Sequence, residues 1–323
     1  MQEIESWQNG KWVPNSQIGT RLWDAHYFCG WAVFDAFRTY NHVPHLMTEH
    51  IDRLYRSARL AEVTFEMNKK EMTDHVNEVI EHNKKFFPKE EEYRFMIFVS
   101  PGFFRIYDDM GDPGPIITIN TTTTSRYAKH IVPFIVDGYT ALVSSQRHIP
   151  SRFFDPKIKS CSRLHYGIAD AEAERYGKGV WPILLDEYGC ISESSGANVG
   201  FIKDHALYLP QDNNILRGCT MGFVEKIASQ LNIDVSKGDW EVYDVLDADC
   251  VLFTSTFLGI APSYKVIFRN QEFKLSGYSD KSKRRTVEQL FEGFSNSVGI
   301  NIVEQWLEWS KKNNVQKIIE KEK

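Results

Sequence analysis

The feature that most constrains this 323-residue chain is the segment from Lys159 to Asn198. It contains a lysine, a helix-like run, a strand, and then Glu193 in a frame of small residues: Ser192, Ser194, Ser195, Gly196 and Ala197. A lysine that acts as a nucleophile must be held neutral. With its ordinary pKa of about 10.4 it is an ammonium ion at neutral pH, and the ammonium form has no lone pair. A carboxylate flanked by small residues is typical of one packed close to a flat ligand.

A lysine and a positioned acid are together what pyridoxal phosphate chemistry requires. The lysine forms a Schiff base, and the anion keeps the pyridine nitrogen protonated. Most lysines are solvated surface groups, so either residue alone would be weak support. Lys157 lies two positions from Lys159 and is the rival Schiff-base residue.

The surrounding motifs resemble the class IV aminotransferases, which include branched-chain and D-amino-acid aminotransferases, (R)-selective amine transaminases and aminodeoxychorismate lyase. The resemblance spans roughly residues 7 to 295. It implies a two-domain α/β fold of type IV with pyridoxal 5'-phosphate in the cleft between the domains, in a homodimer or a larger homo-oligomer. The motifs that carry it are Trp7–Gly10, Val33–Asp35, Glu49–Leu54, Asp155–Ser160, Ala169–Ala173, Leu184–Gly189, Ser192–Asn198, Val199–Asp204, Ile215–Thr220 and Phe253–Thr256.

The periodicity of apolar residues predicts alternating strands and helices. The run Thr121–Ser125 is the one plausible linker, which predicts an N-terminal α/β domain over 1–124 and a C-terminal domain with the lysine over 125–300. A helical extension over 301–323, with a charged end, is expected to pack without chemistry of its own. Helices are predicted over Met47–Ala61, Lys70–Lys85, Leu164–Tyr176, Thr220–Gln230 and Val287–Ser297.

The resemblance assigns the cofactor contacts residue by residue. Lys159 matches the catalytic lysine, which also moves a proton once a substrate has displaced it, and Glu193 matches the carboxylate on the pyridine nitrogen. Without the family, Arg53 could instead pair with Glu49 or Asp52 on its own helix, and Thr220 could be an ordinary N-cap. The implied phosphate ligands are Arg53, Cys219, Thr220 and Thr256.

The implied substrate contacts are Phe34, Arg94 and Phe257. Phe34 matches an aromatic wall of the pocket, although alone it would be taken for a core residue. Arg94 matches an arginine of the branched-chain subgroup, but Glu92 stands where that subgroup has a tyrosine. An apolar pocket beside one cation predicts an amino acid with a hydrophobic side chain as the donor and a 2-keto acid as the acceptor.

Two further departures bear on the substrate and the cofactor. The Arg-x-His carboxylate trap of the D-amino-acid subgroup is not evident, and Arg105 is a weak substitute. Leu164 replaces the tyrosine that meets the cofactor's 3-hydroxyl in branched-chain enzymes, which leaves Arg163 as the nearest polar candidate. An (R)-selective amine transaminase, a lyase of the aminodeoxychorismate type and a non-catalytic cofactor binder therefore remain alternatives.

The bulk properties exclude other classes. A net charge of −5 and a pI near 6.1 argue against a nucleic-acid binder. Five widely spaced cysteines, without a CxxC pair, favour reduced thiols in the cytoplasm and give no metal site. No signal peptide and no membrane-spanning apolar run are visible, so the expected partners are small molecules and further copies of the chain.

Overall fold

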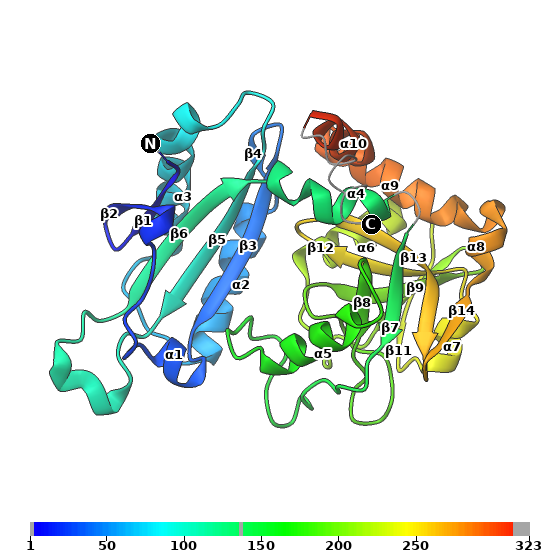
Figure 1. The fold of residues 1–323 in the computed structure, drawn as a ribbon, viewed down its shortest axis with the longest axis horizontal. Coiled ribbons are helices and arrows are strands. Elements are labelled where there is room, and N and C mark those ends of the chain that lie inside the picture. The colour runs from blue at the N-terminus through cyan, green and yellow to red at the C-terminus, as the bar shows by residue number, and fades with distance from the viewer. Residues whose placement is uncertain (1–2, 136–137, 313–323) are drawn as a thin grey trace. The chain divides into compact units, whose positions relative to one another are not determined.

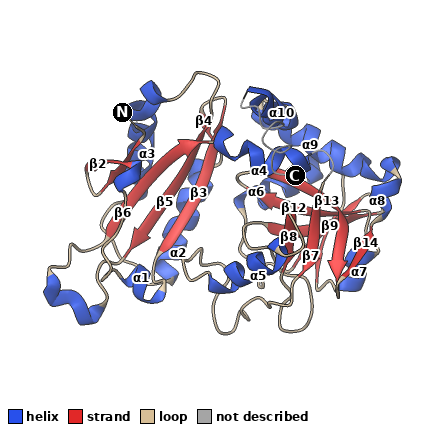
Figure 2. Ribbon diagram, in the orientation of Figure 1, coloured by secondary structure: helices blue, strands red, loops and turns tan. Residues whose placement is uncertain are grey.

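The computed structural model describes residues 3–135 and 138–312. The chain divides into two compact units, which are described separately here (Figure 1). Unit 1 contains residues up to Ser125 together with Ile158–Arg163, and unit 2 contains Arg126–Lys157 and the chain from Leu164 onward. Both units combine sheets with helices (Figure 2).

Unit 1 is built on an antiparallel six-stranded sheet in the order β2-β1-β6-β5-β3-β4. Its helices are α1 (Ala25–Cys29), α2 (Met47–Leu60) and α3 (Lys69–Asn83), with 3₁₀ turns at Asn15–Gln17, Lys84–Phe86 and Arg105–Met110. Its strands are β1 (Glu5–Gln8), β2 (Lys11–Pro14), β3 (Val33–Tyr40), β4 (Val43–Pro44), β5 (Tyr93–Ser100) and β6 (Ile116–Thr123).

The two faces of this sheet differ because side chains alternate along a strand. One face of β3 and β5 supplies Val33, Phe37, Phe95 and Ile97 to a core that is completed from α2 and α3 by Ile51, Leu54, Met72 and Val76. The opposite face carries three cross-strand pairs in register: Phe34 with Phe98, Ala36 with Met96, and Arg38 with Arg94.

The segment that contains Lys159 belongs to unit 1, although the boundary predicted near residue 125 assigns it to the C-terminal domain. Its backbone runs beside the start of β3. The Phe34 N–H donates to the Lys159 carbonyl at 3.0 Å, and the Cys161 N–H donates to the Ala32 carbonyl at 2.9 Å. On the other side, the Lys159 N–H donates to Ser57 Oγ of α2 at 3.1 Å. These contacts join residues that lie more than a hundred positions apart, which no local pattern reveals.

Unit 2 contains a mixed sheet in the order β11-β10-β9-β12-β13-β7-β8, with β14 paired to β13. Strands β9, β12 and β13 are buried nearly throughout, as expected for strands covered on both faces. The strands are β7 (Tyr139–Val143), β8 (Val180–Ile183), β9 (Asn198–Lys203), β10 (Ala206–Pro210), β11 (Val235–Gly238), β12 (Cys250–Ser255), β13 (Gly259–Phe268) and β14 (Gln271–Lys274).

The helices of unit 2 include each one predicted there. They are α4 (Ala128–Ile135), α5 (Leu164–Glu174), α6 (Cys219–Gln230), α7 (Val242–Leu246), α8 (Ser276–Ser279), α9 (Arg285–Val298) and α10 (Ile302–Lys312), with a 3₁₀ turn at Lys281–Arg284. A further 3₁₀ turn, Ser125–Tyr127, spans the boundary between the two units. Of the expected extension over 301–323, residues 313–323 lie outside the described part of the chain. Across the described residues, no helix is long and apolar enough to cross a membrane.

Candidate active site

Lys159 stands on the face of the unit 1 sheet that lies opposite the core. Its Nζ lies 4.8 Å from the centre of the Phe34 ring, and the Arg163 guanidinium lies 5.6 Å from the same ring. An aromatic face attracts both cations. The rival Lys157 belongs to unit 2, where its Nζ is ion-paired with Asp155 at 3.0 Å. The two lysines therefore have different surroundings, although they are two residues apart.

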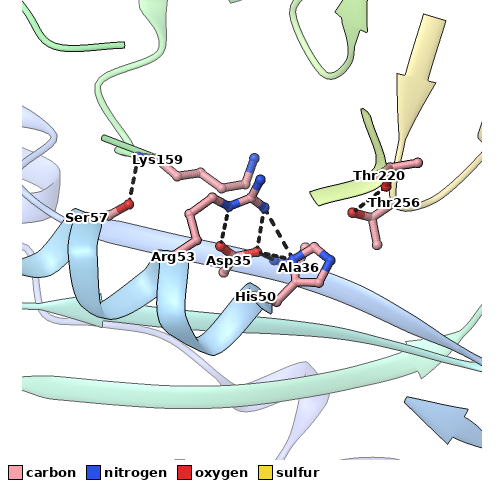
Figure 3. Close-up of polar contacts among 8 residues, drawn as sticks. All are labelled: Asp35, Ala36, His50, Arg53, Ser57, Lys159, Thr220 and Thr256. Atoms are coloured by element: carbon pink, nitrogen blue, oxygen red, sulfur yellow. Dashed lines mark hydrogen bonds and ion pairs between the residues drawn. The ribbon is translucent and has the colours of Figure 1, made fainter. Parts of the chain in front are cut away.

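Arg53 is buried and is fixed by Asp35 of β3, not by the helix neighbours Glu49 or Asp52 (Figure 3). Its Nε donates to Asp35 Oδ2 and its Nη2 to Asp35 Oδ1, both at 2.8 Å. Burial raises the pKa of Asp35, but the Arg53 guanidinium and a hydrogen bond from His50 hold it well below its usual range. The result is a guanidinium that is charged, buried and fixed in direction.

His50 completes this network from the first turns of α2. Its Nδ1 lies 2.7 Å from Asp35 Oδ1, which also accepts the Ala36 N–H at 2.7 Å (Figure 3). Burial lowers the pKa of His50 despite the neighbouring carboxylate. The neutral imidazole therefore donates its Nδ1–H to Asp35 and leaves Arg53 as the counter-charge. The sequence offers Glu49 and Asp52 as partners for Arg53, and it does not reveal Asp35 as the partner that Arg53 and His50 share.

Glu193 lies in unit 2 and is also buried and fully engaged. Its Oε1 accepts the Tyr166 hydroxyl at 2.5 Å and lies 3.0 Å from His148 Nε2, while Oε2 accepts the Leu216 N–H at 3.3 Å. Burial raises the pKa of Glu193, but these hydrogen bonds, that of His148 first, bring it below its ordinary value. The site thus provides a buried, ionised and oriented carboxylate.

Tyr166 is a hydroxyl-bearing residue close to Leu164, the position at which the family pattern has a tyrosine. The Leu164 side chain is 79% exposed, whereas Tyr166, two residues further along α5, reaches the Glu193 carboxylate. Its hydroxyl also lies 3.0 Å from His148 Nε2. Neither Tyr166 nor His148 was predicted. The sequence signal for Tyr166 was that it carries a hydroxyl two positions after the family's tyrosine position. No local signal exists for His148, because its partner Glu193 lies 45 residues away in the chain.

The start of α6 provides donors for an anion. Gly218 is the N-cap and makes no side-chain cap, so Thr220 is an interior first-turn residue and not the cap. Thr220 is buried, and its Oγ1 donates to Thr256 Oγ1 at 3.4 Å (Figure 3). Cys219 is the first residue of this helix. First-turn N–H groups and the helix dipole favour an anion at this end.

The predicted substrate residues have distinct surroundings. Arg94 is half-buried on β5, in register with Arg38. Phe257 of unit 2 packs edge-on against Tyr127 and Trp306. Glu92, which replaces the family tyrosine, is buried and accepts the N–H groups of Asn41 and His42, so it stabilises the turn between β3 and β4. Arg105 is exposed at the start of its 3₁₀ turn.

The chain matches known proteins along most of its length. The family model for amino-transferase class IV matches residues 32–266. A Methanocaldococcus jannaschii protein named for branched-chain-amino-acid aminotransferase activity is 27% identical over 300 residues, 92% of this chain and 98% of that protein. A Bacillus subtilis protein named aminodeoxychorismate lyase is 25% identical over 262 residues, 80% and 85% of the two chains.

Solved structures share the fold. The crystal structure of a branched-chain aminotransferase from the archaeon Thermoproteus uzoniensis, with norvaline, matches with a TM-score of 0.77 at 20% sequence identity, over 95% of this chain and 98% of that chain. The branched-chain amino acid aminotransferase from Thermobaculum terrenum, in its PLP form, matches with a TM-score of 0.74 at 19% identity, over 92% and 94% of the two chains. At these identities the likeness establishes the fold: two α/β units of the fold-type IV kind.

The family match and the fold define a pyridoxal-phosphate-dependent enzyme. The chain belongs to the amino-transferase class IV family, whose model covers well over half of it. The predicted family, fold class, cofactor and transferase activity are therefore confirmed.

Proposed function

We propose that Lys159 is the catalytic lysine of this aminotransferase and that the enzyme exchanges an amino group between an amino acid with a hydrophobic side chain and a 2-keto acid. The observation that carries this proposal is the position of the Lys159 amine over the Phe34 ring, on the sheet face that also bears Met96, Phe98 and Arg94. That face offers apolar surface for a side chain and a guanidinium for a carboxylate.

Different residues of the chain are assigned to the phosphate, to the pyridine nitrogen and to proton transfer. Pyridoxal phosphate, when bound, supplies the electron sink that makes the substrate's Cα proton removable. Arg53, Thr220 and Thr256 bind the phosphate, with the N–H of Cys219 as a further donor. Glu193 holds a proton on the pyridine nitrogen, and His148 and Tyr166 keep that carboxylate ionised and oriented. Lys159 then moves the proton at the substrate Cα as a neutral amine.

A lyase is the second candidate, because the Bacillus subtilis relative is named aminodeoxychorismate lyase. The two activities differ in what they need. A lyase releases pyruvate without a keto acceptor, whereas a transferase needs an acceptor for each turnover. Pyruvate release in stoichiometric amounts, with no acceptor added, would select the lyase.

The substrate class is tested by comparing the wild type with R94A on leucine, D-alanine and a carboxylate-free amine. R105A is the matched control, because Arg105 is exposed on a 3₁₀ turn. We expect leucine to be the preferred donor and R94A to raise its KM by roughly 10- to 100-fold, the effect of losing one charge-assisted contact. R105A should leave KM unchanged. Amine turnover above amino-acid turnover, and insensitive to R94A, would instead indicate an amine transaminase.

A homodimer is also proposed, on the basis of an exposed apolar cluster in unit 1. The cluster consists of Leu22, Tyr27, Phe28, Ile106 and Met110, each at least half exposed. Such a patch is typical of an interface. We expect light scattering to give twice the mass of one chain, and F28D to give monomers. V43D, at an exposed position outside the cluster, should leave the dimer intact. A wild-type monomer would contradict this assignment.

We also propose a cytoplasmic location, on the basis of the free thiols. Within the described residues, no disulfide joins the five cysteines. Reduced thiols are the usual state of cysteine in the cytosol. Fractionation of the native host should therefore find the enzyme with cytosolic markers, and recovery with an exported fraction would contradict the location.

A further inference from the structure

The C-terminal helix α10 presents one buried face to the rest of unit 2. Ile302, Trp306 and Trp309 are each at most 5% exposed, and they recur at spacings of four and three residues. This is the spacing of one face of an α-helix. Trp306 is among the largest side chains with less than 2% exposure in the described part of the chain. Helix α10 packs beside α4, as Figure 1 shows.

The indole of Trp306 contacts Phe257, the second residue of the turn between β12 and β13. The two ring centres lie 5.6 Å apart at an interplanar angle of 64°. Phe257 is held on another side by Tyr127, at 4.6 Å and 76°. Trp309 contacts Trp306 at 4.9 Å. Edge-to-face contacts of this kind fix the direction of a ring as well as its burial.

The same turn is supported at its end by α9 and α10. Gly259 has a φ of +73°, and a Cβ placed there would lie 3.4 Å from the Phe294 ring and 3.6 Å from Ile302. Leu258 is buried, and its N–H donates to Ser255 Oγ at 3.2 Å. Helices α9 and α10 therefore pack against the C-terminal end of this turn.

Thr256 is the first residue of this turn, next to Phe257. Its Oγ1 accepts the Thr220 hydroxyl of α6, at the helix end that offers donors to an anion. A hydroxyl contributes to binding most when its position is fixed before the ligand arrives, because no ordering cost is then incurred. Movement of Phe257 would carry the adjoining Thr256 with it.

We propose that α10 is a brace for the phosphate end of the site, in which Trp306 fixes Phe257 and thereby positions the Thr256 hydroxyl. Trp306 is thus a positioning residue for cofactor binding. The proposal rests on the phosphate-binding role of Thr256 given above. It assigns a function to a helix that was expected to pack without chemistry of its own.

The test is a double-mutant cycle on the apo form of the full chain, titrated with pyridoxal 5'-phosphate. We expect T256A and W306A each to raise the cofactor Kd by about 3- to 10-fold, the range of one neutral hydroxyl contact. The double variant should bind no more weakly than T256A alone, because coupled residues are not additive. W309A removes a neighbouring indole of the same face and should change the Kd by less than about 2-fold, because this indole packs against Trp306, which itself packs against Phe257.

The outcomes separate the two claims. If T256A binds the cofactor as the wild type does, the phosphate role of Thr256 is wrong. If T256A weakens binding, two results would show that the brace is wrong. One is that W306A leaves the cofactor Kd unchanged, and the other is that the double variant shows the product of the two single increases in Kd. Should W306A not fold, W306F replaces it. Amide exchange of residues 253–259 in W306F must then rise above the wild-type rate, while an unchanged rate overturns the proposal.

Discussion

Replacing Asp35 with Asn should destabilise unit 1 more than any loss of a surface ion pair. The carboxylate is fully buried and receives Nε and Nη2 of Arg53, Nδ1 of His50 and the Ala36 N–H. Removing one partner of a buried ion pair costs about 3–5 kcal/mol, because the other charge is left uncompensated. That range corresponds to a roughly 100- to 4,000-fold larger opening equilibrium constant.

The assay is amide hydrogen exchange of apo-enzyme peptides from α2 and β3, which reports the opening of unit 1 locally. D52N is the matched control. Asp52 pairs with Lys69 at 2.5 Å, but the two side chains are 44% and 55% exposed. An exposed pair contributes about 0–1 kcal/mol. Equal effects of D35N and D52N, both below about 1 kcal/mol, would refute the reasoning.

The same network predicts the pH dependence of this stability. The pKa of Asp35 is lower in the folded state than in the unfolded state. Its contribution is therefore fully present above the unfolded pKa of about 3.9 and is lost as the pH falls toward the folded pKa. In D35N, the free energy of opening unit 1, measured by amide exchange, should fall less steeply with decreasing pH than it does in the wild type. If this free energy falls as steeply in D35N as in the wild type, carboxylates other than Asp35 cause the loss of stability in acid.

Three further predictions follow from the site. R53A should raise the cofactor Kd by roughly 10- to 100-fold, whereas R56A, an exposed arginine on the same helix, should not; equal Kd values would exclude a phosphate contact. E193Q should bind cofactor but slow single-turnover proton transfer, and a wild-type rate would remove its role. G218A should cost about 1–3 kcal/mol in urea unfolding, while G222A, where an added Cβ meets nothing, should be neutral or stabilising; the reverse order would contradict the packing.

The elements of the fold were largely predictable because their patterns are local. Helix α2 shows its buried stripe of Ile51, Leu54 and Ala58 in the sequence, and it was predicted over nearly the observed range. Lys159 and Glu193, which both lie in the segment from Lys159 to Asn198, were proposed as site residues from residue type and motif alone. Helix α4 was not predicted, since Pro133 within it argues against a helix interior.

The partners of the site residues were not predictable, because they depend on tertiary contacts. Asp35 meets Arg53 only after β3 and α2 pack, and His148 meets Glu193 across 45 positions. The local pattern offered Glu49 and Asp52 only as alternative partners for Arg53, and the structure pairs it with Asp35 instead. Tyr166 required knowing which face of α5 turns inward, and that face is defined by Ala169 and Ala173 rather than by a strong apolar stripe.

The most direct test of the account is to identify the lysine that bonds the cofactor. The enzyme is loaded with pyridoxal 5'-phosphate, reduced with borohydride, digested and mapped by mass spectrometry. We expect a pyridoxyl label on Lys159, no specific label in K159A, and an unchanged label in K157A. A label on Lys157, or one that persists in K159A, would contradict it.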